Sequence, residues 1–186
     1  MHDVTIPAEL GTFFENSPIA LALASPDGDT PLRLINRRFQ ELTGYGGQDL
    51  IGRNCRVLQG NADDREARAK LRAFLANDAA ANVRTPILNF KKDGTAFVNL
   101  LYMSRLRALS GETRFIFASQ FDVSGAHPER LQAYDQELGK TLTRLSPLAA
   151  ESGIIVEGTL TTVANSAHAI AQAKLILANL DDSSLL

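Results

Sequence analysis

The chain has 186 residues, of which 45% are hydrophobic and 22% are charged, and its formal net charge is −2. This composition is typical of a globular protein and excludes a disordered chain, while the small net charge provides no general attraction to nucleic acid. A single cysteine, Cys55, excludes an internal disulfide and favours a reducing compartment. No apolar stretch has the length of a membrane span and the N-terminus lacks the pattern of a secretory signal, so we expect a cytoplasmic protein without membrane contact.

The first elements alternate short apolar runs with turn residues. A short helix is predicted at 7–16, where a proline stands at the start. Two buried strands are predicted at 19–25 and 32–36, and the Asp-Gly pair at 27–28 indicates that they form a hairpin.

Helical signals dominate the next segment. Asn36 suits the N-cap of a short helix that ends at Gly44. Residues 45–60 mix glycine, polar and apolar residues, which predicts a loop with short helical turns. Strong helix formers fill 62–78, and four apolar positions in it share one face: Ala67, Leu71, Phe74 and Leu75.

Three strand-like segments follow at 83–90, 95–109 and 113–124. Tight turns separate them, which predicts an antiparallel meander. Together with the hairpin, this pattern predicts an α+β fold with a five-stranded antiparallel sheet and short helices on one face.

The last sixty residues predict a helical extension of two helices punctuated by Pro147 and Gly153. Both helices carry an apolar stripe, the first at Leu131, Leu138, Leu142 and Leu145, the second at Leu160, Val163, Ala167, Ile170, Lys174 and Leu177. Because such stripes must be buried, we expect a homodimer built through these helices rather than helices that fold back on their own sheet. Acidic residues outnumber basic ones by seven to four after residue 125, so this extension is a poor nucleic-acid binder.

Signatures of ordinary enzymes are missing from the sequence. The three histidines, His2, His127 and His168, have neither metal-ligand spacing nor a nearby nucleophile. Phosphate-binding glycine motifs are also absent from the sequence. We therefore expect no enzyme and no metal site.

The cysteine lies in an unusual stretch, GRNCRVLQG at 52–60, with Arg53 and Arg56 close to Cys55. A free cysteine is most often a small buried core residue. The arginines also allow a redox-sensing thiol, because positive charge favours the thiolate.

A third reading comes from the whole stretch, which resembles the signature of the light-oxygen-voltage (LOV) family, the flavin-binding branch of PAS domains. The family pattern is close to GRNCRFLQ, and this chain departs from it only at Val57. Three further stretches are similar to the family in the same order: NRRFQELTGY, LNFKKDGTAFVNL and ASQFD. The resemblance covers about 13–123 and implies a PAS sensor domain at 17–124 between an N-terminal helical cap at 1–16 and the extension at 125–186.

The resemblance implies a blue-light photoreceptor that binds FMN. Cys55 would bond reversibly to flavin carbon C4a in the light, and Gln120 would relay the change to the flanking helices. The implied cofactor ligands are Asn54, Arg56, Leu58, Gln59, Arg72, Asn89, Asn99, Leu101 and Gln120, with Leu75, Met103 and Phe117 as further ring contacts. Val57 is expected to change the lifetime of the bond.

These residue types suit the chemistry of a flavin nucleotide. Amide side chains carry a donor and an acceptor for the ring edge, and guanidinium groups suit the phosphate. Arg72 and its neighbour Arg68 could instead be solvated residues on an exposed helix face. A PAS dimerisation or ligand-binding module without photochemistry also stays open, as does the redox sensor, and the downstream protein partner is not identified.

Overall fold

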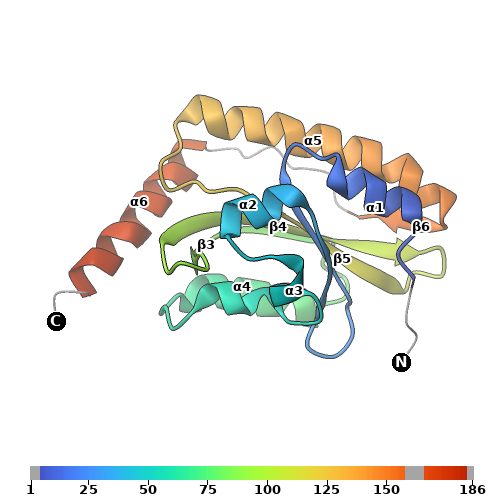
Figure 1. The fold of residues 1–186 in the computed structure, drawn as a ribbon, viewed down its shortest axis with the longest axis horizontal. Coiled ribbons are helices and arrows are strands. Elements are labelled where there is room, and N and C mark those ends of the chain that lie inside the picture. The colour runs from blue at the N-terminus through green and yellow to red at the C-terminus, as the bar shows by residue number, and fades with distance from the viewer. Residues whose placement is uncertain (1–4, 158–165, 184–186) are drawn as a thin grey trace.

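Residues 5–157 and 166–183, which the computed structural model describes, form a six-stranded antiparallel sheet between two layers of helices (Figure 1). The strand order is β2-β1-β5-β4-β3, and β6 pairs with β4. The strands are β1 Ala20–Ala24, β2 Leu32–Ile35, β3 Asn82–Phe90, β4 Ala96–Ala108, β5 Thr113–Gln120 and β6 Ile154–Val156. The helices are α1 Ala8–Glu15, α2 Arg37–Thr43, α3 Gly47–Leu50, the 3-10 helix η1 Cys55–Gln59, α4 Arg65–Ala76, α5 Pro128–Glu151 and α6 Ser166–Ser183.

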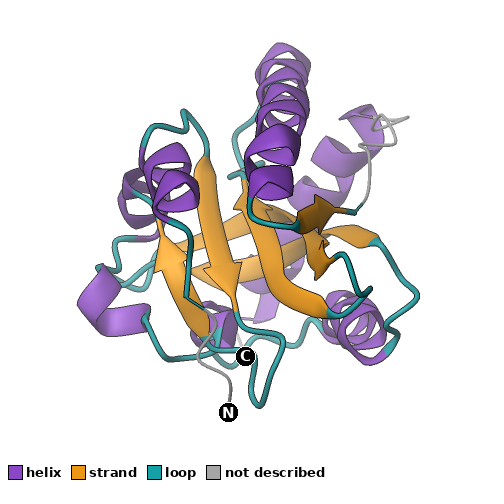
Figure 2. Cartoon of the chain, turned by 90° about the vertical axis from the view of Figure 1, so that its right-hand side faces the viewer, coloured by secondary structure: helices purple, strands orange, loops and turns teal. Residues whose placement is uncertain are grey.

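The predicted α+β fold class is confirmed, with two differences in the sheet and its cover. Helices lie on both faces, because α1 and α5 cover one face while α2, α3, η1 and α4 cover the other (Figures 1 and 2). The sixth strand, β6, follows α5 and pairs with the end of β4, where Ala108 faces Ile154. β4 is 13 residues long and extends past β3, so its free backbone groups there pair with the returning chain.

Strand β1 contributes buried side chains to both faces of the sheet. Its residues alternate leucine and alanine, and all of them are buried. Leu21 and Leu23 join the core beneath α1 and α5, whereas Ala20, Ala22 and Ala24 face the helices that follow β2. Because successive side chains of a strand point to opposite faces, one short run supplies large residues to one core and small ones to the other.

The expected helix break at Pro147 is wrong, because α5 continues through this residue to Glu151. Proline removes one helical hydrogen bond, which usually ends or kinks a helix. Here Leu145 and Ala149, on either side of Pro147, are both buried against the sheet. Their burial outweighs the lost bond, and α5 ends instead before Gly153, whose φ of 68° lies in the left-handed region.

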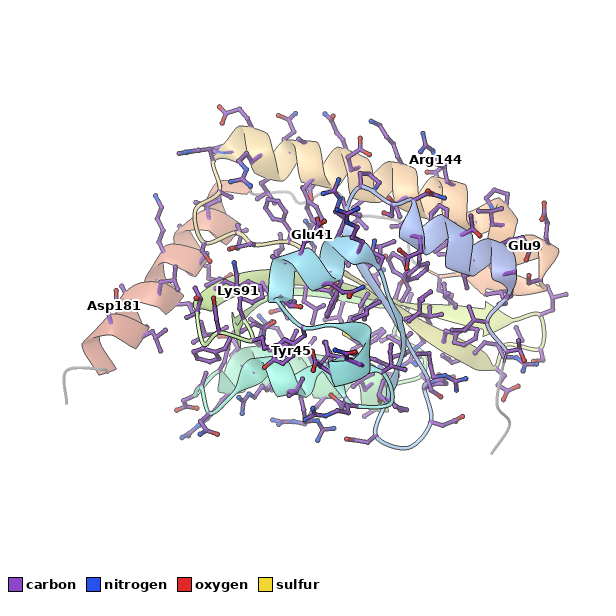
Figure 3. All side chains as sticks on the ribbon, viewed as in Figure 1. Glu9, Glu41, Tyr45, Lys91, Arg144 and Asp181 are labelled. Atoms are coloured by element: carbon purple, nitrogen blue, oxygen red, sulfur yellow. The ribbon has the colours of Figure 1, made fainter. Side chains whose placement is uncertain are left out.

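The leucine stripe predicted on α5 is confirmed, but it is already buried against other parts of the same chain. All four of its leucines are buried in the core beneath α5, together with residues of β1, β4 and β5. The helix therefore folds back on its own sheet, and the argument that its stripe requires a second chain is wrong. Helix α1 lies beside α5, where Glu9 and Arg144 line a shared groove (Figure 3).

The second stripe is only partly reproduced on α6. Ile170 is buried and Leu177 packs against the same core, whereas Lys174 is exposed. Leu160 and Val163 lie outside the described residues, as does the side chain of Ala167. Within the described part of the chain, no helix is long and apolar enough to cross a membrane.

Candidate functional site: a cavity beneath η1 and α4

A cavity of about 340 Å³ lies between the sheet and the helices η1 and α4. This volume is within the range of small-molecule sites, about 300–1,000 Å³. Small side chains make room for it, since Ala22 and Ala24 of β1 and Ala118 of β5 form part of its wall. Larger apolar side chains line the rest: Leu32, Leu71, Leu75, Ile87, Leu101, Met103 and Ile116.

Cys55 lines this cavity at the first position of η1. Asn54 caps the helix, because its Oδ1 accepts a hydrogen bond of 2.8 Å from the backbone N–H of Arg56. The thiol is half-buried, and desolvation raises the pKa of Cys55 to about 12. The neutral thiol therefore prevails at physiological pH, which disfavours a redox sensor that depends on a thiolate.

Three amide side chains enter the cavity from three neighbouring strands. Asn89 lies on β3, Asn99 on β4 and Gln120 on β5, and all are buried. Asn99 Nδ2 donates to Asn89 Oδ1 at 3.0 Å, so the first two amides support each other.

Gln120 has no such support. Neither its Nε2 nor its Oε1 has a hydrogen-bond partner among the described residues, although only 3% of the residue is exposed. A buried amide left without partners costs about 1–3 kcal/mol per group. The cavity thus presents one donor and one acceptor that fit a ligand with complementary amide-like atoms.

Three arginines line the cavity, Arg56 from η1 and Arg68 and Arg72 from α4, and Arg56 and Arg72 are exposed to solvent. Arg56 forms an ion pair with Asp29 of the hairpin loop. Arg68 donates to the carbonyl of Gly60 at 3.5 Å, and its buried Nε has no partner within the described residues. These guanidinium groups fit an anionic group such as a phosphate.

Arg68 is the charged lining residue that the sequence prediction did not assign to the cofactor. It was available from the spacing, because residues four apart on a helix share a face and Arg72 was already assigned to the phosphate. Arg72 itself is exposed and also lines the cavity. Exposure on a helix therefore does not distinguish an arginine that can contact a ligand from one that contacts only solvent.

Of the predicted cofactor ligands, eight line the cavity and Leu58 does not. Leu58 belongs to the apolar cluster that contains Phe39 and Leu50, and the same cluster includes Ala22 and Ile116 of the cavity wall. Val57, the departure from the family pattern, packs against the same cluster and is also outside the lining.

Phe117 was wrongly expected as a ring contact. On β5, Ile116, Ala118 and Gln120 face the cavity, so the alternation of the strand places Phe117 on the opposite face. There it makes an edge-to-face contact with Phe14, at 5.9 Å between ring centroids. Leu75 and Met103, the other two expected contacts, line the cavity.

The donor set as a whole fits a flavin nucleotide. Amides from the sheet face the interior, apolar side chains form the walls, and arginines contribute guanidinium groups to the lining. Among the described residues, no group of three or more His, Cys, Asp or Glu side chains could hold a metal ion.

Comparisons with known proteins agree with this architecture. A family model for the PAS domain matches residues 18–125, and the chain therefore belongs to the PAS domain family. A solved LOV domain from a blue-light activated histidine kinase of Erythrobacter litoralis is 35% identical, with a TM-score of 0.53, over 56% of this chain and 95% of that one. This match assigns the chain to the LOV branch of the family.

Two further relatives extend the comparison. A blue-light-activated histidine kinase of Rhizobium johnstonii is 43% identical over 96 residues, which are 52% of this chain and 27% of that one. The chain thus spans about a quarter of the length of that kinase. The crystal structure of a Rhodobacter sphaeroides LOV protein aligns with 94% of this chain and with 96% of its own chain, with a TM-score of 0.69 and 21% identity. The similarity in fold therefore includes the helical extension as well as the sheet.

Proposed function

We propose that this chain is a blue-light photoreceptor that binds FMN in the cavity and bonds it reversibly to Cys55. The observation that carries the proposal is the partnerless amide of Gln120, buried in the same cavity as the single thiol of a LOV-family chain. When bound, the flavin supplies blue-light absorption and a ring carbon, C4a, that accepts the Cys55 sulfur.

The binding roles follow from the chemistry of the lining. Arg56, Arg68 and Arg72 hold the phosphate, and the Asp29 partner of Arg56 must then share or release its guanidinium. Asn54 and Gln59 hold the ribityl chain near η1. The ring edge pairs with the amides of Asn89, Asn99 and Gln120, and Leu75, Leu101 and Met103 enclose the ring faces.

Cys55 enters the reaction as a neutral thiol, because its pKa is raised by burial. Bound FMN would supply C4a as the carbon that takes up the Cys55 sulfur and N5 as the atom that takes up the thiol proton, and Cys55 would regain the proton when the bond breaks. Cys55 carries no charge before light is absorbed, which suits a half-buried position beside an apolar wall.

Gln120 relays the change to the rest of the protein. Its amide can donate through Nε2 or accept through Oε1, so rotation lets it follow a ring nitrogen that changes from acceptor to donor. Replacing Gln120 with leucine is expected to preserve Cys55 bond formation, seen as bleaching, and to reduce the structural response about tenfold. Circular dichroism and hydrogen exchange in darkness and light measure that response, and an unchanged response contradicts the relay.

The absorption spectrum tests the proposal directly. The purified protein is expected to be yellow, with a structured blue band that bleaches under blue light and returns in darkness. Protein that stays colourless when supplied with FMN indicates a PAS module without photochemistry. Protein that reacts with oxidants and ignores light indicates a thiol sensor, and either result contradicts the photoreceptor.

The output is proposed to be a change in association rather than catalysis. The proposed division places the cap at 1–16, the sensor at 17–124 and the extension at 125–186, and a homodimer or a downstream protein responds through the extension. Support comes from α5, which packs on the sheet that carries the cavity amides, so that a change in the sheet reaches the extension directly.

A further inference from the structure

We infer that Tyr134 of α5 is the residue through which the state of the cavity reaches the helical extension. The inference rests on the proposed photoreceptor function and names the contact that carries its output. Tyr134 is buried, with 5% of the residue exposed, and lies against the end of β5.

The two neighbours of Gln120 in the chain both hold Tyr134. Gln120 faces the cavity, so Ser119 and Phe121 face the other side of the sheet, towards α5. The hydroxyl groups of Ser119 and Tyr134 are hydrogen-bonded at 2.8 Å. The rings of Phe121 and Tyr134 are stacked, with centroids 4.4 Å apart and an interplanar angle of 18°.

A second cavity amide acts on the same pair. Asn99 Oδ1 accepts a hydrogen bond of 3.3 Å from the backbone N–H of Phe121, and the carbonyl of Phe121 accepts one of 2.8 Å from the N–H of Leu100. The backbone at Phe121 is therefore fixed by a side chain that also lines the cavity. A change in the hydrogen bonds of either Asn99 or Gln120 acts on the residues that contact Tyr134.

An ion pair extends the contact to the edge strand β3. Asp135, next to Tyr134, pairs with Arg84 of β3, and the Arg84 guanidinium lies over the Tyr134 ring at 5.9 Å from its centroid. Both charged side chains are largely buried. Tyr134 is thus held by strands β3 and β5, the two that carry Asn89 and Gln120.

This arrangement makes Tyr134 a positioning residue for α5. Interior side chains are close-packed, so a small shift of Ser119 or Phe121 cannot be absorbed locally and must move the ring between them. Leu131 and Leu138, one turn on either side of Tyr134, are fully buried and transmit that movement along α5.

Replacing Tyr134 with phenylalanine tests the inference, because the ring stays and only the hydroxyl is lost. Hydrogen exchange of α5 amides is compared in the FMN-free protein, in the FMN complex in darkness and in the same complex under blue light. In the variant, FMN binding and bleaching are expected to match the parent, while the differences in α5 exchange caused by FMN and by light fall about fivefold.

Two further variants keep the test decisive. Ser119→Ala removes the same hydrogen bond from the strand and is expected to reproduce the effect, which guards against a folding defect in the first variant. Thr141→Val removes another buried hydroxyl on the same face of α5, two turns away, and is expected to leave the exchange differences unchanged.

The outcomes separate this inference from the proposed function. Full bleaching with an unchanged α5 response in Tyr134→Phe and Ser119→Ala overturns the role of Tyr134 and leaves the photoreceptor intact. A parent protein that binds FMN but does not bleach contradicts the photoreceptor. In that case the role of Tyr134 is tested by the change in α5 exchange that FMN causes in darkness, compared between the parent and the two variants.

Discussion

Replacing Cys55 with alanine is expected to abolish the light-induced bleaching while the protein remains yellow. Cys55 is the single cysteine of the chain, and it lines the cavity at the start of η1. The other groups assigned to FMN are untouched, and the cap from Asn54 to Arg56 uses only the backbone N–H at that end. We therefore expect the affinity for FMN to stay within about threefold of the parent value, less than 1 kcal/mol.

Absorption spectra before and after blue light measure the bleaching, and fluorescence titration of free FMN measures the affinity. Cys55→Ser is the matched control for size, because it restores the volume of the side chain with a hydroxyl that is a far weaker nucleophile. Serine is also expected to block bleaching. A band that still bleaches and recovers in the alanine variant would contradict covalent chemistry at Cys55.

The largest effect on stability is expected at Asn36, where alanine should lower the free energy of unfolding by about 3–5 kcal/mol. Asn36 is fully buried. Its Oδ1 accepts from the backbone N–H groups of Phe39 at 3.0 Å and Leu21 at 2.9 Å. Its Nδ2 donates to the carbonyls of Phe14 at 3.0 Å and Ile19 at 2.8 Å. One amide thus joins α1, β1 and α2, and its loss removes a hydrogen bond from four backbone groups, of which the Phe14 carbonyl keeps the N–H of Ser17 at 3.1 Å.

Thermal unfolding of the FMN-free protein measures this effect, with an expected decrease in Tm of roughly 10 °C. Asn36→Asp separates the two halves of the amide, since a carboxylate keeps both acceptor bonds and cannot donate to Phe14 and Ile19. Its stability should lie below that of the parent. Asn16→Ala is the control on an exposed asparagine with one hydrogen bond, and should change Tm little. Equal effects at Asn16 and Asn36 would show that burial does not set the cost.

The role of Asn36 also shows how far local sequence reasoning reaches. Its position before an amphipathic run predicted the N-cap of α2, and Gly44, with a φ of 74°, ends that helix as expected. The bonds to Phe14, Ile19 and Leu21 could not be predicted, because they join residues 15 to 22 positions away.

The same limit applies to the cavity. The stretch at 52–60 identified Cys55 and its neighbours, and the asparagines on adjacent strands were recognised as an unusual pair. Phe117 and Gln120 lie three positions apart on β5, so their side chains point to opposite faces of the sheet, and only Gln120 enters the cavity. Leu58 follows Cys55 by one turn of η1 and lies in the apolar cluster that also contains Ala22 and Ile116 of the cavity wall, so its assignment as a cofactor contact stays a prediction.

Turn residues, caps and hydrophobic periodicity act over a few positions, and they were sufficient for the strands β1 to β5 and the helices α1, α2 and α4, whereas the cysteine motif was recognised by its resemblance to a family. The course of the extension was decided by packing between distant segments. The sheet buries Leu145 and Ala149 strongly enough to carry α5 past Pro147, and the free end of β4 takes up β6. The place of Tyr134 between Ser119, Phe121 and Arg84 is likewise visible only in the folded chain, because no spacing along the sequence brings these four residues together.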